Sequence, residues 1–324
     1  DVYKRQILIT TLIGIAIFAG LSIWGNISEV AVLMSRFPWG WLPGILFLTS
    51  INYLLRFLKW HYYLSVLNIR ITKVDSALIF FSGLSFSVTP YKAGEVVKSF
   101  FLERACGEKT CRTVPIVLAE RLTDVTGMVL LAAIGALNYS FGPYVVGATI
   151  AAIIVLLFLS QSPKMSMVII NAMGRFPVLR RYRNDLITLY QSSHELLGPK
   201  PTVLATFIST ASWFFECLAA WLILSALNAG VSIFQATSTY AISSIAGAIV
   251  LLPGGLGATE ASLVGMLVMS NVPNAVAACA TFLIRISTLW YGVTLGMIVS
   301  GLLLRRWHFS PFSVSTVPEL SNGK

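Results

Sequence analysis

Long apolar segments constrain this chain more than any other feature of its sequence. They are about 20 residues long, the length that a helix needs to cross the hydrocarbon core of a bilayer. Only 11% of the 324 residues are charged, whereas soluble domains carry about 25%. The sequence therefore predicts an all-α, polytopic membrane protein with about six full crossings, at residues 6–25, 42–66, 113–139, 144–160, 202–227 and 274–303. We expect the first to be a retained helix rather than a cleaved signal peptide, because it is long for a signal and lacks a small-x-small cleavage site.

Two further apolar stretches, at 75–102 and 234–270, are each interrupted near the middle by proline and glycine. The first interruption begins at Pro90 and the second at Pro253. Proline removes a backbone donor and glycine weakens a helix, so each stretch is expected to form two short helices joined by a break. We interpret both stretches as re-entrant hairpins, which enter and leave the membrane on one side. Irregular backbone at that depth must be buried in protein or line a wet cavity.

Lysine and arginine are distributed unevenly over the connections, and this predicts the orientation of the chain. The connection 161–201 holds six of them, whereas 138–143 and 228–233 hold none. We expect the basic side to face the cytoplasm, with both termini there and the chain in the cell inner membrane. This explains the net charge of +10 better than nucleic-acid binding, for which no motif is visible. The connection 161–200 is predicted to lie on the cytoplasmic leaflet as an amphipathic segment, and 305–324 to be a polar cytoplasmic tail.

The two halves of the chain repeat each other in order. Leu-Ser-Val-Leu-Asn at 64–68 matches Leu-Ser-Ala-Leu-Asn at 224–228. The distribution of basic residues places these two segments on opposite sides, so we predict an inverted repeat with halves at 1–141 and 142–304. Further matches follow at similar offsets: Pro90, Gly94 and Glu95 with Pro253, Gly257 and Glu260, Arg121 with Arg285, and Gly127 with Gly292.

Inverted repeats that contain broken helices are the sequence pattern of a transport site near the bilayer midplane. Such repeats also build folds that do not transport, and kinks are tolerated in ordinary membrane helices. An intramembrane enzyme or enzyme subunit acting on a lipid phosphate is therefore one alternative, and a small-solute or ion transporter is another. No histidine lies near the acidic residues of the apolar segments, and neither a Ser–His catalytic pairing nor a metal-ligand cluster is visible. We expect no enzyme activity, no cofactor and no metal site.

Charged residues in apolar segments mark the candidate site, because each costs about 2.5–3.5 kcal/mol at the centre of the bilayer on insertion scales. Glu120 and Asp124 share one helix face, and Arg121 is adjacent. Two interpretations stay open: an internal ion pair that locks helices together, or an Arg121 that binds an anion in a cavity while the acids hold it. Arg285 has no acid in its own turn, so its partner is expected to be Glu95, Glu216, Glu260 or a bound phosphate.

Basic residues and helix termini near the breaks extend this set. Arg56, Lys59 and Lys98 lie close to predicted helix ends, where they either snorkel to the interface or belong to the site. The helix after each break directs free N–H groups toward it, and these attract anions. Glu95 and Glu260 would cap these helices, receive an amine headgroup or accept a proton. The first hairpin also carries Lys92, whereas the second has no basic residue, so the site is expected to be asymmetric.

Four motifs together resemble the lysylphosphatidylglycerol synthase transmembrane (flippase-domain) family, over nearly the whole chain. They are Pro-Tyr-Lys-Ala-Gly-Glu at 90–95, Glu-Arg-Leu-Thr-Asp at 120–124, Pro-Gly-Gly-Leu-Gly-Ala-Thr-Glu at 253–260, and Arg285. Some members fuse this membrane domain to a soluble aminoacyltransferase domain. The resemblance here implies a stand-alone member and the flippase half of the activity. That activity moves an anionic or aminoacylated phospholipid, or a polyprenyl-phosphate-linked lipid, between leaflets.

The resemblance and the charge pattern lead to one expected mode of binding. The headgroup would bind at the broken hairpins while the acyl chains stay in lipid through a lateral opening. The expected partners are a membrane lipid with a phosphate headgroup and either a second copy of the chain or a lipid-modifying enzyme. The expected substrate-binding residues are Arg56, Lys92, Glu95, Glu120, Arg121, Asp124, Gly254, Gly255, Gly257, Glu260 and Arg285.

Overall fold

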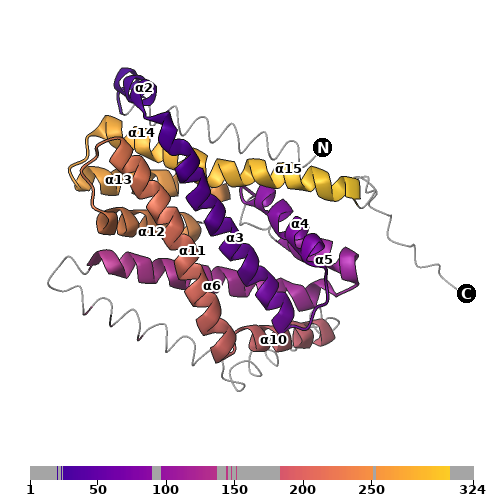
Figure 1. Cartoon of the computed structure of the whole chain (residues 1–324). Coiled ribbons are helices and arrows are strands. Elements are labelled where there is room, and N and C mark those ends of the chain that lie inside the picture. Colours follow the sequence, from indigo (N-terminus) through magenta and orange to yellow (C-terminus); the bar gives the residue numbers. More distant parts are fainter. Residues whose placement is uncertain are drawn as a thin grey trace, which may run out of the picture.

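Apart from a few isolated positions, the computed structural model describes residues 25–89, 96–136, 183–250 and 253–306. Every regular element in these ranges is a helix, which confirms the all-α prediction (Figure 1). The predicted crossings at 6–25 and 144–160 lie almost wholly outside the described residues. So do most of the connection 161–200 and the tail after residue 306.

The described part of the first half is built from helices. In chain order they are α2 (Ile27–Arg36), η1 (Trp39–Trp41), α3 (Leu42–Val66), α4 (Lys73–Gly83), η2 (Leu84–Phe86), α5 (Val97–Cys106) and α6 (Thr110–Ala136).

The second half has the same kind of construction, and its last long helix contains a π-helical turn, η5. The elements are α10 (Arg183–Leu196), α11 (Pro199–Ala226), α12 (Ile233–Ile249), η4 (Pro253–Gly255), α13 (Ala258–Met269), α14 (Asn274–Arg285), η5 (Ile286–Trp290) and α15 (Tyr291–Arg306).

Within the described ranges, three helical spans are long and apolar enough to cross a membrane: Trp39–Val66, Pro199–Ala226 and Asn274–Arg306. They agree with three of the predicted crossings. Helix α6 coincides with a fourth and has 27 residues, but it carries the charges of Glu120, Arg121 and Asp124 and is not among the three.

Both stretches that were predicted to be interrupted contain two helices, α4 with α5 and α12 with α13. The second interruption is described except for residues 251–252, and it has left-handed backbone at Gly254 and Gly255. Glycine adopts such dihedral angles without strain, so the sequence there ends α12 and starts α13 separately. Residues 90–95 of the first interruption, which include Lys92 and Glu95, lie outside the described residues.

The repeated Leu-Ser-x-Leu-Asn segments form the same turn in both halves. Asn68 and Asn228 have φ values of 54° and 53°. In each case the next residue donates its backbone N–H to the carbonyl of the leucine that starts the motif, at 2.9 Å from Leu64 and from Leu224. The helix that follows is capped in both halves, by Thr72 before α4 and by Ser232 before α12. The sequence match therefore corresponds to matched local structure.

Helices α3 and α11 pack against each other in antiparallel fashion and form the centre of the bundle (Figure 1). Asn52 donates from Nδ2 to the carbonyl of Ser212 at 2.8 Å. Two turns further along α3, Lys59 contacts Ser209, which lies earlier on α11. Asn52 and Ser212 are separated by 160 residues, which is the offset of the two matching turns.

The last helix of each half packs on the other half, so the halves interlock. Helix α6 packs on α11 and α12, and α15 packs on α4. Gly127 of α6 allows a close approach, because a Cβ atom there would lie 2.9 Å from the backbone nitrogen of Thr210. Two apolar clusters complete the core, one centred on α11–α14 and one on α3–α5 around Trp60 and Phe80.

Candidate functional site

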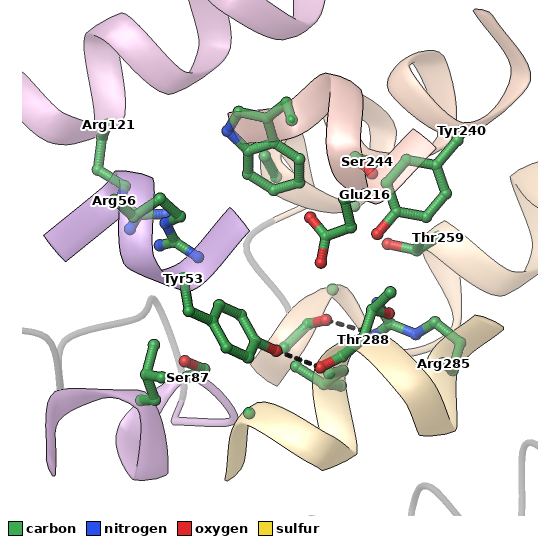
Figure 2. A pocket seen from close by; sticks show the side chains of 18 residues that line it. Tyr53, Arg56, Ser87, Arg121, Glu216, Tyr240, Ser244, Thr259, Arg285 and Thr288 are labelled. Atoms are coloured by element: carbon green, nitrogen blue, oxygen red, sulfur yellow. Dashed lines mark hydrogen bonds between the residues drawn. The ribbon is translucent and has the colours of Figure 1, made fainter. Parts of the chain in front are cut away.

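A partly open, polar cavity of about 100 Å³ lies where the two halves meet. One part of it is lined by residues of α3, α6, α11 and α12 and by the η2 segment up to Ser87. The second break, the start of α13 and the segment from α14 to the start of α15 line the rest (Figure 2). Its charged lining residues are Arg56, Arg121, Glu216 and Arg285. Placing charged side chains inside a bundle of apolar helices costs free energy, so their presence around a cavity indicates a functional site.

Arg285 and Glu260 hold the second break in shape. Arg285 donates from Nε to Glu260 Oε1 at 2.6 Å and from Nη2 to the carbonyl of Gly254 at 2.7 Å. The other carboxylate oxygen of Glu260 accepts the backbone N–H of Gly257 at 2.7 Å, which caps α13. Glu260 is thus the partner of Arg285 among those expected. The pair is almost fully buried, so it fixes the break as well as supplying a cation to the cavity wall.

Two further buried ion pairs lie behind the cavity in the first half. Lys59 contacts Asp124 at 2.5 Å, and Lys98 contacts Glu120 at 2.6 Å. The ammonium of Lys98 also lies 4.7 Å from the ring centre of Trp60. The alternative in which Lys59 and Lys98 snorkel to the interface is therefore wrong, because both are buried and their charges are used inside the bundle.

Arg121 and Arg56 lie together at one side of the cavity (Figure 2). Arg121 is more exposed than the members of the buried ion pairs, with 27% of its side chain accessible, and its Nη2 lies 3.8 Å from Asp124 Oδ2. The guanidinium of Arg56 lies 5.8 Å from the ring centre of Trp213 on α11. Each interpretation of the 120–124 segment therefore describes part of the structure. Its acids form internal ion pairs with buried lysines, and its arginine lines the cavity.

The structure brings together only part of the expected set. Arg56, Arg121, Gly254, Gly255 and Arg285 line the cavity. The remaining described members stand behind it as partners of cations or as a helix cap: Glu120, Asp124, Glu260 and Gly257.

Sequence reasoning left Glu216 out of the binding set, although this residue lines the cavity between the arginines and Tyr240 (Figure 2). A signal was available. Glu216 follows Arg56 by 160 residues, the offset of the matching turns, so the two occupy equivalent positions on α3 and α11. A glutamate opposite an arginine at equivalent positions inside apolar helices indicates a shared polar site. Tyr53 also lines the cavity and donates to the carbonyl of Thr288.

The charges of the site are polarised between the halves. The first half contributes four basic residues and two acids, and the second contributes one basic residue and two acids. Among described residues this leaves a surplus of two positive charges in the first half and of one negative charge in the second. The ion pairs of the two interrupted stretches also have reversed polarity, because the cation is on α5 in the first half and on α14 in the second. An anion is attracted to the side of Arg56 and Arg121. In the described ranges, no three acidic, histidine or cysteine residues form a metal-binding group.

The fold and the cavity define an all-helical membrane protein with a charged site inside its bundle. Residues 11–296 match the lysylphosphatidylglycerol synthase TM region, and the chain belongs to this family. A UPF0104 membrane protein of Pyrococcus horikoshii is 24% identical over 91% of the chain and 96% of its own length. One from Methanocaldococcus jannaschii is 25% identical over 66% of the chain and 91% of its own length. A third, from Methanothermobacter thermautotrophicus, is 31% identical, but the match spans only 29% of this chain and 28% of the relative.

Proposed function

We propose that this protein moves a phosphate-bearing lipid between the leaflets of the cell membrane. The observation that carries the proposal is the position of Arg121, which joins the polar cavity to an apolar outer surface. Leu118 and Val125 lie three residues before it and four after it, so all three share a face of α6. Both apolar side chains are exposed, and Arg121 lines the cavity. A lipid can therefore place its phosphate at the guanidinium and leave its acyl chains outside the bundle.

The charge of the cavity supports an anionic group as the bound portion. Arg56, Arg121 and Arg285 line it together with one acid, Glu216. Guanidinium groups are well suited to phosphate, because their donors match its oxygens in pairs. The substrate class is an anionic or aminoacylated phospholipid or a polyprenyl-phosphate-linked lipid, which agrees with the lipid-related nature of the family.

The proposed mechanism is alternating access of an inverted repeat with two re-entrant hairpins and both termini in the cytoplasm. The antiparallel packing of α3 and α11, the matched turns at Asn68 and Asn228, and the two broken helix pairs support it. In this arrangement, the hairpins open toward opposite leaflets. Transport by rocking of one repeat against another around a fixed site is common in such folds.

Reconstitution into liposomes with fluorescent lipids tests the proposal. Dithionite bleaches only the outer leaflet, so the bleached fraction reports lipid movement. We expect faster movement of labelled phosphatidylglycerol than in protein-free vesicles, and slow movement with Arg121→Gln and Arg56→Gln. Val203→Ala, an exposed position on α11 outside the cavity lining, is the matched control and is expected to retain wild-type rates.

Three outcomes would contradict the proposal. Movement at the protein-free rate for phosphatidylglycerol, phosphatidylethanolamine and a polyprenyl phosphate would exclude lipid translocation of the stated class. A chemically altered lipid, detected by mass spectrometry, would favour the enzyme alternative. Flux of a small anion through vesicles in which lipids do not move would favour the small-solute transporter.

A further inference from the structure

The helical span of residues 274–306 changes its winding next to the cavity. Helices α14 and α15 are joined there by the π-helical turn η5, in which the backbone N–H of Tyr291 donates to the carbonyl of Ile286, five residues before it. Thr288 and Leu289 of this turn line the cavity. Turns of this type are rare, and they occur frequently at functional sites.

The π-helical turn accommodates one residue that the corresponding helix of the first half lacks. In α6, Gly127 follows Arg121 by six residues, and the helix is regular throughout. Their partners in the predicted repeat, Gly292 and Arg285, are seven residues apart. One extra residue in a regular α-helix would rotate everything after it by about 100°. The wider turn absorbs that residue, so Gly292 keeps a close approach to α3 as Gly127 does to α11.

The span is fixed to a different half of the chain on each side of the turn. Before it, Arg285 donates to Glu260 and to the carbonyl of Gly254, which ties α14 to the second break. After it, α15 packs on α4 and η2 of the first half, and Ser300 donates to the carbonyl of Ser82 at 3.5 Å. Movement of one half relative to the other therefore acts on the segment between these anchors, and helices bend sharply at π-helical turns.

Tyr53 of α3 holds this turn from the first half. Its hydroxyl donates to the carbonyl of Thr288, and the backbone of Gly292 also interacts with it. Thr288 and Gly292 are four residues apart, so the hydroxyl lies between two backbone groups that pair with each other in a regular α-helix. A Cβ atom at position 292 would lie 2.5 Å from the same hydroxyl oxygen, so glycine is needed there for the tyrosine to approach.

We propose that η5 is the hinge at which the two halves move relative to each other during lipid movement, and that Tyr53 is a positioning residue that holds this hinge. The inference rests on the proposed function, because a hinge is required only if the halves move. Hinges consist of a few residues that absorb changes in backbone angles. Tyr53, Thr288 and Leu289 line the cavity, so a headgroup bound there lies against the hinge.

Deletion of Ile286 tests the hinge, because it restores the six-residue spacing of the first half and allows a regular α-helix. Ile286 is exposed and lies outside the cavity lining, and residues 287–292 keep their spacing to one another. We expect lipid movement in the liposome assay to fall by about tenfold or more. Binding of short-chain phosphatidylglycerol, measured by native mass spectrometry, should stay within about threefold of wild type, because the charged lining residues are kept.

Ile286→Ala is the matched control for the deletion. It removes the same side chain without changing the length of the helix, so it is expected to retain the wild-type rate of lipid movement.

Hydrogen exchange examines the hinge without any lipid movement. In the wild-type protein in detergent, the amides of residues 286–292 should exchange faster than those of α14 and α15, because local opening is easiest at the hinge. Tyr53→Phe is expected to raise their exchange rate by about fivefold or more, because the hydroxyl that holds the turn is removed.

Tyr291→Phe is the matched control for Tyr53→Phe. The two rings stack with their centres 6.0 Å apart, and the hydroxyl of Tyr291 contacts Ser50 Oγ at 2.9 Å. This variant loses one hydroxyl contact between the same helices but leaves the carbonyl of Thr288 paired, so exchange at 286–292 should stay within about twofold of wild type.

Several results would overturn these assignments. Wild-type lipid movement after deletion of Ile286 overturns the hinge alone, and so does a loss of lipid binding as large as the loss of movement. If the deletion variant does not fold, exchange at 286–292 as slow as in the flanking helices overturns the hinge. Equal exchange in Tyr53→Phe and Tyr291→Phe overturns the role of Tyr53. Absence of movement of any phosphate-bearing lipid by the wild-type protein overturns the proposed function, and the hinge with it.

Discussion

At the scale of single residues, some charged side chains of this protein stabilise the fold and others line the cavity. Arg285 and Glu260 are buried and hold the backbone of the second break, whereas Arg121 is partly accessible. Breaking a buried pair leaves an uncompensated charge, which costs about 3–5 kcal/mol. An accessible pair contributes about 0–1 kcal/mol. The arginine at 285 therefore chiefly stabilises the fold, whereas the arginine at 121 chiefly contributes charge to the cavity.

This contrast gives a prediction about stability. Arg285→Ala should lower the free energy of unfolding by about 3–5 kcal/mol, and Arg121→Ala by about 1 kcal/mol or less. Thermal unfolding in detergent micelles measures both. The double variant Arg285→Ala/Glu260→Ala is expected to recover part of the loss, since no charge is then left unpaired. Equal destabilisation by the two single variants would contradict this assignment.

Glu216 is the one acid among the described charged residues that line the cavity, and it should set the preference of the cavity among headgroups. Glu216→Gln keeps the shape of the side chain and removes its charge. We expect phosphatidylglycerol to bind about threefold to tenfold more tightly relative to phosphatidylethanolamine, because repulsion of the anion is removed. Competition between the two lipids in native mass spectrometry measures this ratio. An unchanged ratio would show that Glu216 does not act on the ligand.

At the scale of elements, the second break depends on glycine for its shape. Gly254 has a φ of 60°, and a Cβ atom there would lie 3.2 Å from Leu289 and 3.3 Å from Val88. Gly254→Ala should therefore cost about 1–2 kcal/mol from the backbone alone and should slow lipid movement. Gly265→Ala in α13 is the matched control, because nothing lies within 4 Å of its Cβ position and alanine favours a helix. Thermal unfolding and the liposome assay together measure the effect; equal behaviour of the two variants would be the contrary result.

The elements themselves could be read from the sequence to a large extent. Apolar length predicted α3, α11 and the α14–α15 span, and proline and glycine predicted the separation of α12 from α13. Apolar length, proline and glycine determine helix formation and helix ends locally, so these elements could be predicted without knowledge of tertiary contacts. The partners of the charges could not be derived in the same way. Lys59 and Asp124 are 65 residues apart and meet only because α3 and α6 pack together.

The cavity itself was predictable only in part. Arg56, Arg121 and Arg285 stand out because arginine is costly in an apolar helix. The choice of which acid would face the cavity required packing: Glu120 and Asp124 are turned to lysines, and Glu216 faces the cavity. Comparing the halves position by position would have suggested Glu216, because the offset of 160 residues pairs it with Arg56.

At the scale of the whole molecule, the halves are expected to depend on each other for folding. Helix α6 packs on α11 and α12, and α15 packs on α4, so each half alone would expose surfaces that are covered in the complete chain. We expect residues 1–141 and 142–324 to copurify as a complex when they are expressed together, and to aggregate when expressed separately. Size-exclusion chromatography after affinity purification through a tag on one half measures this. A monodisperse, helical first half on its own would contradict the prediction.

The contact between Asn52 and Ser212 has a consequence for how such a cavity can arise. Residues that the predicted repeat pairs meet there, and Arg56 and Glu216, each four residues further along its helix, line one cavity. In a pair of identical subunits, an arginine at position 56 would share that cavity with a second arginine and be repelled by it. A chain that contains both copies in tandem can change the sign of one without the other, as Arg56 and Glu216 do. Duplication and fusion of one gene would thus allow a symmetric scaffold to acquire an electrically directional interior.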